Sequence, residues 1–67
     1  MDWYEEALRV DPCAEDVCRS LMTAYHRLER STDVVATYER CRAALADTRG
    51  LAPSVATQGL FKTLSAR

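Results

Sequence analysis

The sequence predicts an all-α protein made of antiparallel helical hairpins, with about four helices. Apolar residues recur three and four positions apart along most of the chain, which is the spacing of one face of an α-helix. Both prolines and one of the two glycines fall between these apolar stretches, where they would separate helices. The breaks are short, so successive helices are expected to lie antiparallel to one another.

The first two helices are expected over residues 1–10 and about 14–29. The first should end at Asp11, because the proline that follows disfavours helical geometry at the residue before it. The second opens with Glu15 and Asp16, whose charges suit the positive end of a helix dipole. The apolar face of the first helix consists of Trp3, Tyr4, Ala7 and Leu8. That of the second consists of Val17, Cys18, Leu21, Met22, Tyr25 and Leu28.

A third helix is expected over about residues 32–47. Ser31 is placed to act as its N-cap, and Gly50 lies just past its end, where a left-handed residue is commonly needed. The inward-facing residues of this helix are expected to be Val34, Val35, Tyr38, Cys41 and Leu45.

The fourth helix is expected over about residues 54–66, with Ser54 as its cap. Gly59 inside it costs roughly 1 kcal/mol relative to alanine, so it is expected to permit a close contact between helices. The short apolar face of this helix consists of Leu60, Phe61 and Leu64.

Length and composition limit the class of protein. The 67 residues suffice for one small domain, residues 1–67, which buries only about 60% of its unfolded surface. The sequence contains no run of about 18 apolar residues, so no membrane association is expected. Its acidic start is unlike a signal peptide, and the three cysteines indicate free thiols in the reducing cytoplasm.

Charge is unevenly distributed along the chain, although the formal net charge is only −1. The first 16 residues hold six acidic residues and one basic residue, whereas the remainder holds eight basic and four acidic residues. Direct binding to nucleic acid is not expected, because the chain is nearly neutral and no helix clusters base-reading side chains. Solvated helix faces and a basic docking surface both remain open as explanations of the uneven charge.

Neither a metal site nor an enzyme is expected. Cys13, Cys18, His26 and Cys41 are possible ligands, but they lack the paired spacings of structural zinc sites. Cys18 and Cys41 fall within apolar stripes, where a small buried residue fits. Cys18 and His26 lie roughly 12 Å apart along one helix, which is too far for a nucleophile and its base. No cofactor is therefore expected.

Two tyrosines indicate an internal repeat. Tyr4 and Tyr38 lie 34 residues apart and begin the similar stretches YEEALRV and YERCRAA. This period, with the frame C-x₂-L-M-x₂-Y from Cys18 to Tyr25, resembles the tetratricopeptide repeat. The resemblance implies a fragment of a right-handed superhelix, with Tyr25 and Tyr38 in the core. Glu29 departs from the pattern, because a glycine usually stands at that position of the hairpin.

A narrower resemblance depends on three stretches: DP before the second helix, YERCRAAL in the third, and GLAPSVAT before and into the fourth. They resemble the bacterial transcriptional activator domain of SARP-type regulators, of which the chain matches the C-terminal half. The family pattern of glycine, hydrophobic residue, x, proline, serine, x, x, threonine is matched by Gly50, Leu51, Pro53, Ser54 and Thr57. The resemblance implies that the chain is a fragment of a longer protein.

In that family the helical domain usually follows a winged-helix DNA-binding domain, and this sequence contains no such segment. The resemblance therefore implies regulation of transcription through contacts with protein, either within the parent regulator, with a second copy or with another protein. The alternative is a stand-alone tetratricopeptide-like adaptor that binds acidic peptides and has no connection with transcription.

A polar stripe beside the buried face of the second helix is the candidate partner-binding surface. In tetratricopeptide arrays the first helix of each hairpin lines the concave face, so matching positions of the fourth helix would extend the stripe. The resulting groove would suit an acidic peptide or carboxylate through charge-assisted hydrogen bonds. Its residues are Arg19, Thr23, His26, Arg27, Gln58 and Lys62. An ordinary solvated face is the alternative.

The first and last helices are expected to leave apolar side chains for another copy or for the rest of a longer protein. These self-association candidates are Trp3, Leu8, Phe61 and Leu64.

Overall fold

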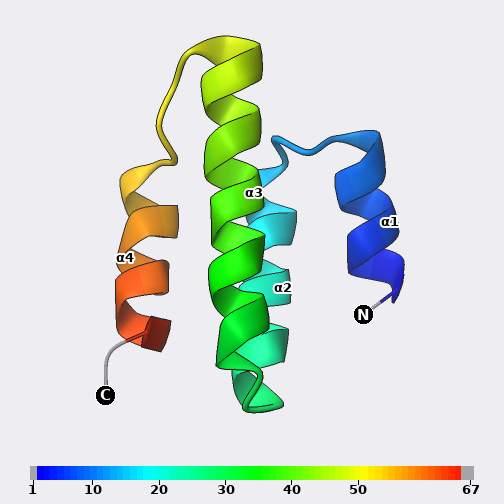
Figure 1. The fold of residues 1–67 in the computed structure, drawn as a ribbon, viewed down its shortest axis with the longest axis vertical. Helices are drawn as coiled ribbons and strands as arrows, with labels where there is room; N and C mark the ends of the chain where they lie inside the picture. Colours follow the sequence, from blue (N-terminus) through cyan, green and yellow to red (C-terminus); the bar gives the residue numbers. More distant parts are fainter. Residues whose placement is uncertain (1, 66–67) are drawn as a thin grey trace.

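The computed structural model describes residues 2–65, and over this range the chain forms four helices and no strand (Figure 1). The helices are α1 (Asp2–Val10), α2 (Glu15–Arg27), α3 (Ser31–Arg49) and α4 (Val55–Ser65). The predicted all-α class is confirmed, whereas the right-handed superhelix remains a prediction. The expected helix ends at residues 1 and 66 lie outside the described residues.

The α2–α3 hairpin forms the centre of the molecule. Figure 1 shows α1 and α4 on opposite sides of this hairpin, with each helix running antiparallel to the one before it. Helix α2 contacts all three other helices, and α4 also contacts α3. No helix within residues 2–65 is long and apolar enough to cross a membrane.

The core lies along the hairpin and is completed by one side chain of α1. Its buried apolar residues are Leu8, Cys18, Leu21, Met22, Tyr25, Val34, Cys41 and Leu45. Tyr25 is therefore part of the core, as predicted. Tyr38 is half-buried against the core and stacks on Phe61 of α4, with ring centroids 4.0 Å apart and ring planes at 6°. The two tyrosines thus pack helices together, as the repeat pattern predicts.

Two helices end at a residue in the left-handed conformation. Gly50 follows α3 with φ 63° and confirms the predicted glycine cap. Glu29 follows α2 with φ 58°, although left-handed geometry is unfavourable for a residue with a Cβ atom. The N–H of Arg30 donates to the carbonyl of Tyr25 at 2.9 Å, and the N–H of Glu29 donates to that of His26 at 3.0 Å, which completes a Schellman motif.

Four local expectations need correction. Val35 does not face inward from α3, because its side chain is 43% exposed. Ser31 is the first residue of α3 rather than its cap, because Arg30 is the N-cap and makes no side-chain capping bond. Helix α2 ends at Arg27 and α3 continues to Arg49, so their ends differ by two residues from those expected. Gly59 permits no close helix contact, because a Cβ atom placed there would meet nothing within 4 Å. By contrast, Ser54 does cap α4, with Oγ 3.4 Å from the backbone N of Thr57.

Candidate interaction surface

Helix α4 is fixed to the first turn of α2 by one carboxylate. Glu15 Oε1 accepts hydrogen bonds from the backbone N–H of Ser54 at 2.8 Å and from the hydroxyl of Thr57 at 2.7 Å. The same hydroxyl accepts a bond from Arg19 Nη1 at 2.9 Å, and Thr57 is completely buried. The serine and threonine of the GLAPSVAT stretch therefore serve to dock α4.

The ionised form of Glu15 is favoured at this position. Burial raises the pKa of the Glu15 carboxyl. The bonds from Ser54 and Thr57 and the nearby charge of Arg19 lower it, and together they outweigh the effect of burial. The net result is a pKa below the usual 4.5. A charged Glu15 therefore accompanies the docked α4 at neutral pH.

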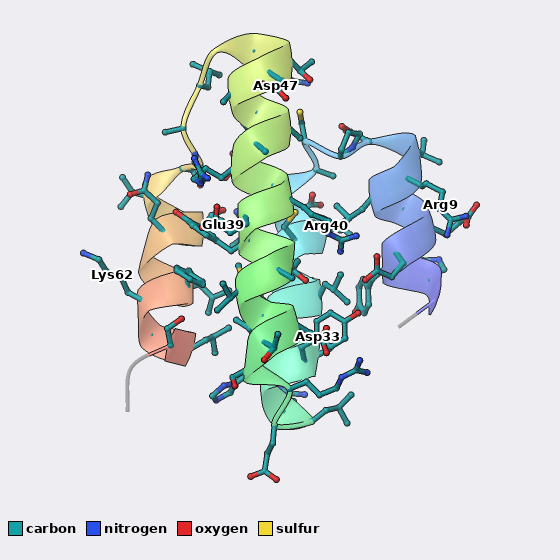
Figure 2. The ribbon with its side chains drawn as sticks, in the orientation of Figure 1. Arg9, Asp33, Glu39, Arg40, Asp47 and Lys62 are labelled. Atoms are coloured by element: carbon teal, nitrogen blue, oxygen red, sulfur yellow. The ribbon has the colours of Figure 1, made fainter. Side chains whose placement is uncertain are left out.

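A second carboxylate connects α1 to the hairpin. Glu5 accepts a bond from the Tyr25 hydroxyl at 2.8 Å and two from the Arg40 guanidinium at 2.9 and 3.2 Å. Figure 2 shows Arg40 reaching from α3 towards α1. The bond from Arg40 does most to lower the pKa of Glu5, burial opposes it, and the Tyr25 bond lowers it further. The same bond from Tyr25 to Glu5 raises the pKa of the tyrosine.

A shallow depression of about 400 Å³ lies over the face of α2 between α1 and α4. We call it the arginine depression, and its lining residues are Tyr4, Arg19, Ser20, Thr23, Ala24, Arg27 and Leu60. None of these residues is acidic. The four ion pairs found among the described residues involve Arg9, Arg30, Arg40 and Arg42, so Arg19 and Arg27 are outside all of them.

The six predicted groove residues do not form one site. Arg19, Thr23 and Arg27 meet in the arginine depression. His26 lines a separate cavity of about 450 Å³, with Val34 and Val35 of α3 and Leu64 of α4.

The two candidates from α4 are not among the lining residues of the depression. The Gln58 side chain donates to the carbonyl of Pro53 at 2.6 Å, within its own chain. Lys62 is exposed and points outward from α4 in Figure 2.

The predicted self-association residues also differ in their surroundings. Trp3 is 71% exposed and makes an edge-on contact with Tyr4, whose ring lines the arginine depression. Leu8 is 7% exposed and belongs to the core, so its side chain has little surface left for a partner. Phe61 and Leu64 are half-buried against the core of their own chain. Trp3 is therefore the most accessible of the four.

The cysteines have core environments. Cys18 and Cys41 are buried, and burial raises the pKa of both thiols, that of Cys18 to about 12. Cys13 is half-buried. Within residues 2–65 no three ligand-type side chains are grouped so that they could hold a metal ion. Cys18 and Cys41 thus occupy the apolar positions that their spacing indicates.

Three residues of these contacts were not predicted from the sequence. The sequence pattern predicts only a helix-dipole role for Glu15 and no role for Glu5 or Arg40. No local pattern identifies Glu15, because the Ser54 N–H and the Thr57 hydroxyl that it accepts lie 39 and 42 positions away. Glu5 and Arg40 lie 35 positions apart, and no local pattern pairs them.

Comparison with known proteins is consistent with this architecture. Neither a curated protein nor a solved structure matches the chain. The family model described as the bacterial transcriptional activator domain matches residues 1–65. This match includes all four helices and both carboxylate contacts. The chain therefore belongs to the bacterial transcriptional activator domain family.

Proposed function

We propose that this chain is a protein-interaction module of a bacterial transcriptional regulator, and that it binds its partner on the face containing the arginine depression. Membership of a transcriptional activator family supports the connection with transcription. The observation that carries the proposal is the depression itself, which holds two arginines and no acidic residue beside the exposed Trp3.

The chemistry of the depression suits an acidic protein surface. Arg19 donates one N–H to Thr57 and retains its other donors, while Arg27 is exposed at the end of α2. Guanidinium groups bind carboxylates through paired hydrogen bonds, and arginine and tryptophan are enriched at the energetic centres of interfaces. Tyr4 and Leu60 add apolar surface for a side chain of the partner.

The module acts by binding and not by catalysis. The Cys18 and Cys41 thiols are buried, and burial raises the pKa of both, which suits core packing rather than nucleophilic attack. DNA recognition belongs to another part of the regulator, and this segment contributes contacts with protein.

A reporter assay tests the proposal. The chain is fused to an unrelated DNA-binding domain, and transcription from a promoter carrying that domain's site is measured in bacteria. Arg27→Glu should reduce the reporter response several-fold. Arg49→Glu is the matched control, because both arginines lie in the last turn of a helix and only Arg27 lines the depression. Equal responses from the two variants would contradict the proposal.

The adaptor alternative uses the same depression, so it needs its own discriminating result. Binding of a labelled acidic peptide that is lost in Arg27→Glu, together with an unchanged reporter response, would favour the adaptor. A salt-dependent mobility shift of DNA by the chain alone would instead show direct nucleic-acid binding.

A further inference from the structure

We propose that Thr57 of α4 is a positioning residue of the arginine depression, because its hydroxyl separates the Arg19 guanidinium from Glu15 and so keeps it available to an acidic partner. This inference rests on the proposed function, since it concerns the regulation of the same face. If α4 were not docked, Glu15 and Arg19 would pair with each other on α2. The depression would then lose one of its two positive charges.

Glu15 and Arg19 are placed so that they could pair directly. They lie four positions apart on α2 with the acidic residue nearer the N-terminus, which is the favourable order for an ion pair on a helix surface. In the part of the chain that the structure describes, however, they form no ion pair with each other. The side chain that lies between them is Thr57.

The Thr57 hydroxyl bridges the two charges in a fixed direction. It donates its proton to Glu15 Oε1 at 2.7 Å and accepts a bond from Arg19 Nη1 at 2.9 Å. An ionised carboxylate can only accept and a guanidinium can only donate, so a hydroxyl group satisfies both at once. Thr57 is completely buried, so the bridge is shielded from water while α4 is docked.

Helix α4 also supplies an apolar wall of the depression. Leu60 lies three positions after Thr57, hence on the same face of α4, and it lines the depression together with Arg19. Docking of α4 therefore completes the depression in two ways, by orienting the guanidinium and by enclosing it. By linkage, a partner that binds in the depression should in turn stabilise the docked position of α4.

Binding of a fluorescently labelled oligoglutamate peptide to the whole chain, measured by anisotropy, tests the inference. Thr57→Val keeps the size of the side chain but removes the hydroxyl, so Arg19 should pair with Glu15. Binding should weaken about fivefold, which is the effect of one partly exposed charge pair. Thr57→Ser retains the hydroxyl and should bind like the wild type. Thr63→Val is the matched control, because the exposed Thr63 hydroxyl bonds to the Gly59 carbonyl of its own helix.

A second substitution separates positioning from a merely structural role. Adding Glu15→Gln to Thr57→Val removes the carboxylate that captures Arg19, so the double variant should bind several-fold more tightly than Thr57→Val alone. If Thr57 served only to dock α4, the added substitution would bring no gain. Circular dichroism checks that the variants are helical. A test on the wild type needs no variant: the peptide should raise hydrogen-exchange protection in α4.

Three results would overturn the inference: Thr57→Val that binds the peptide like the wild type, a double variant that gains nothing over Thr57→Val, or protection of α4 that the peptide leaves unchanged. In each case, loss of binding in Arg27→Glu but not in Arg49→Glu would leave the proposed function standing. A wild-type chain that does not bind the peptide, or binding that Arg27→Glu leaves unchanged, would contradict the proposed function, and this inference would fall with it.

Discussion

The central hairpin and the two outer helices are held in different ways. Helices α2 and α3 meet through buried apolar side chains, among them Leu21, Val34 and Cys41. Helices α1 and α4 also place apolar groups against the hairpin, but each depends in addition on one carboxylate. Glu5 of α1 accepts three hydrogen bonds from Tyr25 and Arg40 of the hairpin. Glu15 of α2 accepts two, from Ser54 and Thr57 at the start of α4.

This difference bears on the proposed function, because the outer helices border the arginine depression. Tyr4 of α1 and Leu60 of α4 form its sides, while α2 forms its floor. Apolar burial is non-directional and largely insensitive to ionisation, whereas bonds to a carboxylate have a fixed geometry and depend on its charge. The surface that we propose for partner binding therefore lies between two helices whose attachment depends on single polar residues.

Truncation of a buried side chain in the hairpin should have the largest effect on stability. Leu21 is completely buried, so Leu21→Ala should lower the free energy of unfolding by about 3 kcal/mol, through lost transfer energy and the cavity left behind. Because α2 contacts every other helix, hydrogen-exchange protection should fall throughout the molecule. Urea unfolding measures the first effect and exchange by NMR the second. Leu28→Ala, at an exposed leucine beyond the end of α2, should change stability little, and equal losses in both variants would refute this account.

Loss of the Glu15 carboxylate should have a smaller and more local effect. Glu15→Ala leaves the Ser54 N–H and the buried Thr57 hydroxyl without their acceptor, which should cost about 2 kcal/mol. Exchange protection should fall mainly in α4. Asp16→Ala is the control, because it removes a carboxylate from the same helical turn without touching α4. An even loss of protection over all four helices would show that α4 is not separately attached.

Acid should weaken the bonds that attach the two outer helices to the hairpin. The pKa values of Glu5 and Glu15 are lowered below the usual 4.5 in the folded protein, so their stabilisation is present above about pH 4.5 and is lost as the pH falls through the folded values. Stability measured by urea unfolding should therefore decline below pH 4.5. Glu15→Gln should flatten this decline, while a variant that titrates like the wild type would rule out Glu15 as a source of it.

The hairpin was largely predictable from the sequence because its determinants are local and periodic. The apolar spacing from Cys18 to Tyr25 specifies one face of a helix, and Gly50 ends the next helix as expected. The repeat pattern also identified Tyr38 as a packing residue, although it could not show that Phe61 would be its stacking partner.

The attachment of the outer helices was not predictable in the same way. Glu15 meets Ser54 across 39 positions, and Glu5 meets Arg40 across 35, so these pairs depend on the tertiary arrangement. The six predicted groove residues failed to gather for the same reason. Helical spacing placed Arg19, Thr23 and Arg27 together on α2, but it could not specify which face α4 would turn towards them.

The smallest expected effect lies at the turn within the hairpin and should raise stability. Glu29 has φ 58°, close to the 63° of Gly50, but it carries a Cβ atom that makes this conformation unfavourable. Glu29→Gly removes that penalty and adds freedom to the unfolded chain, so the net gain should be about 0.5–1 kcal/mol, measured by thermal or urea unfolding. Ala46→Gly, at an exposed position inside α3, should instead lose about 1 kcal/mol. Glu29→Gly should raise the stability of the hairpin and leave the pH dependence that Glu5 and Glu15 confer unchanged, because neither carboxylate bonds to this turn. A loss of stability in Glu29→Gly would mean that the glutamate side chain contributes more than its backbone strain costs.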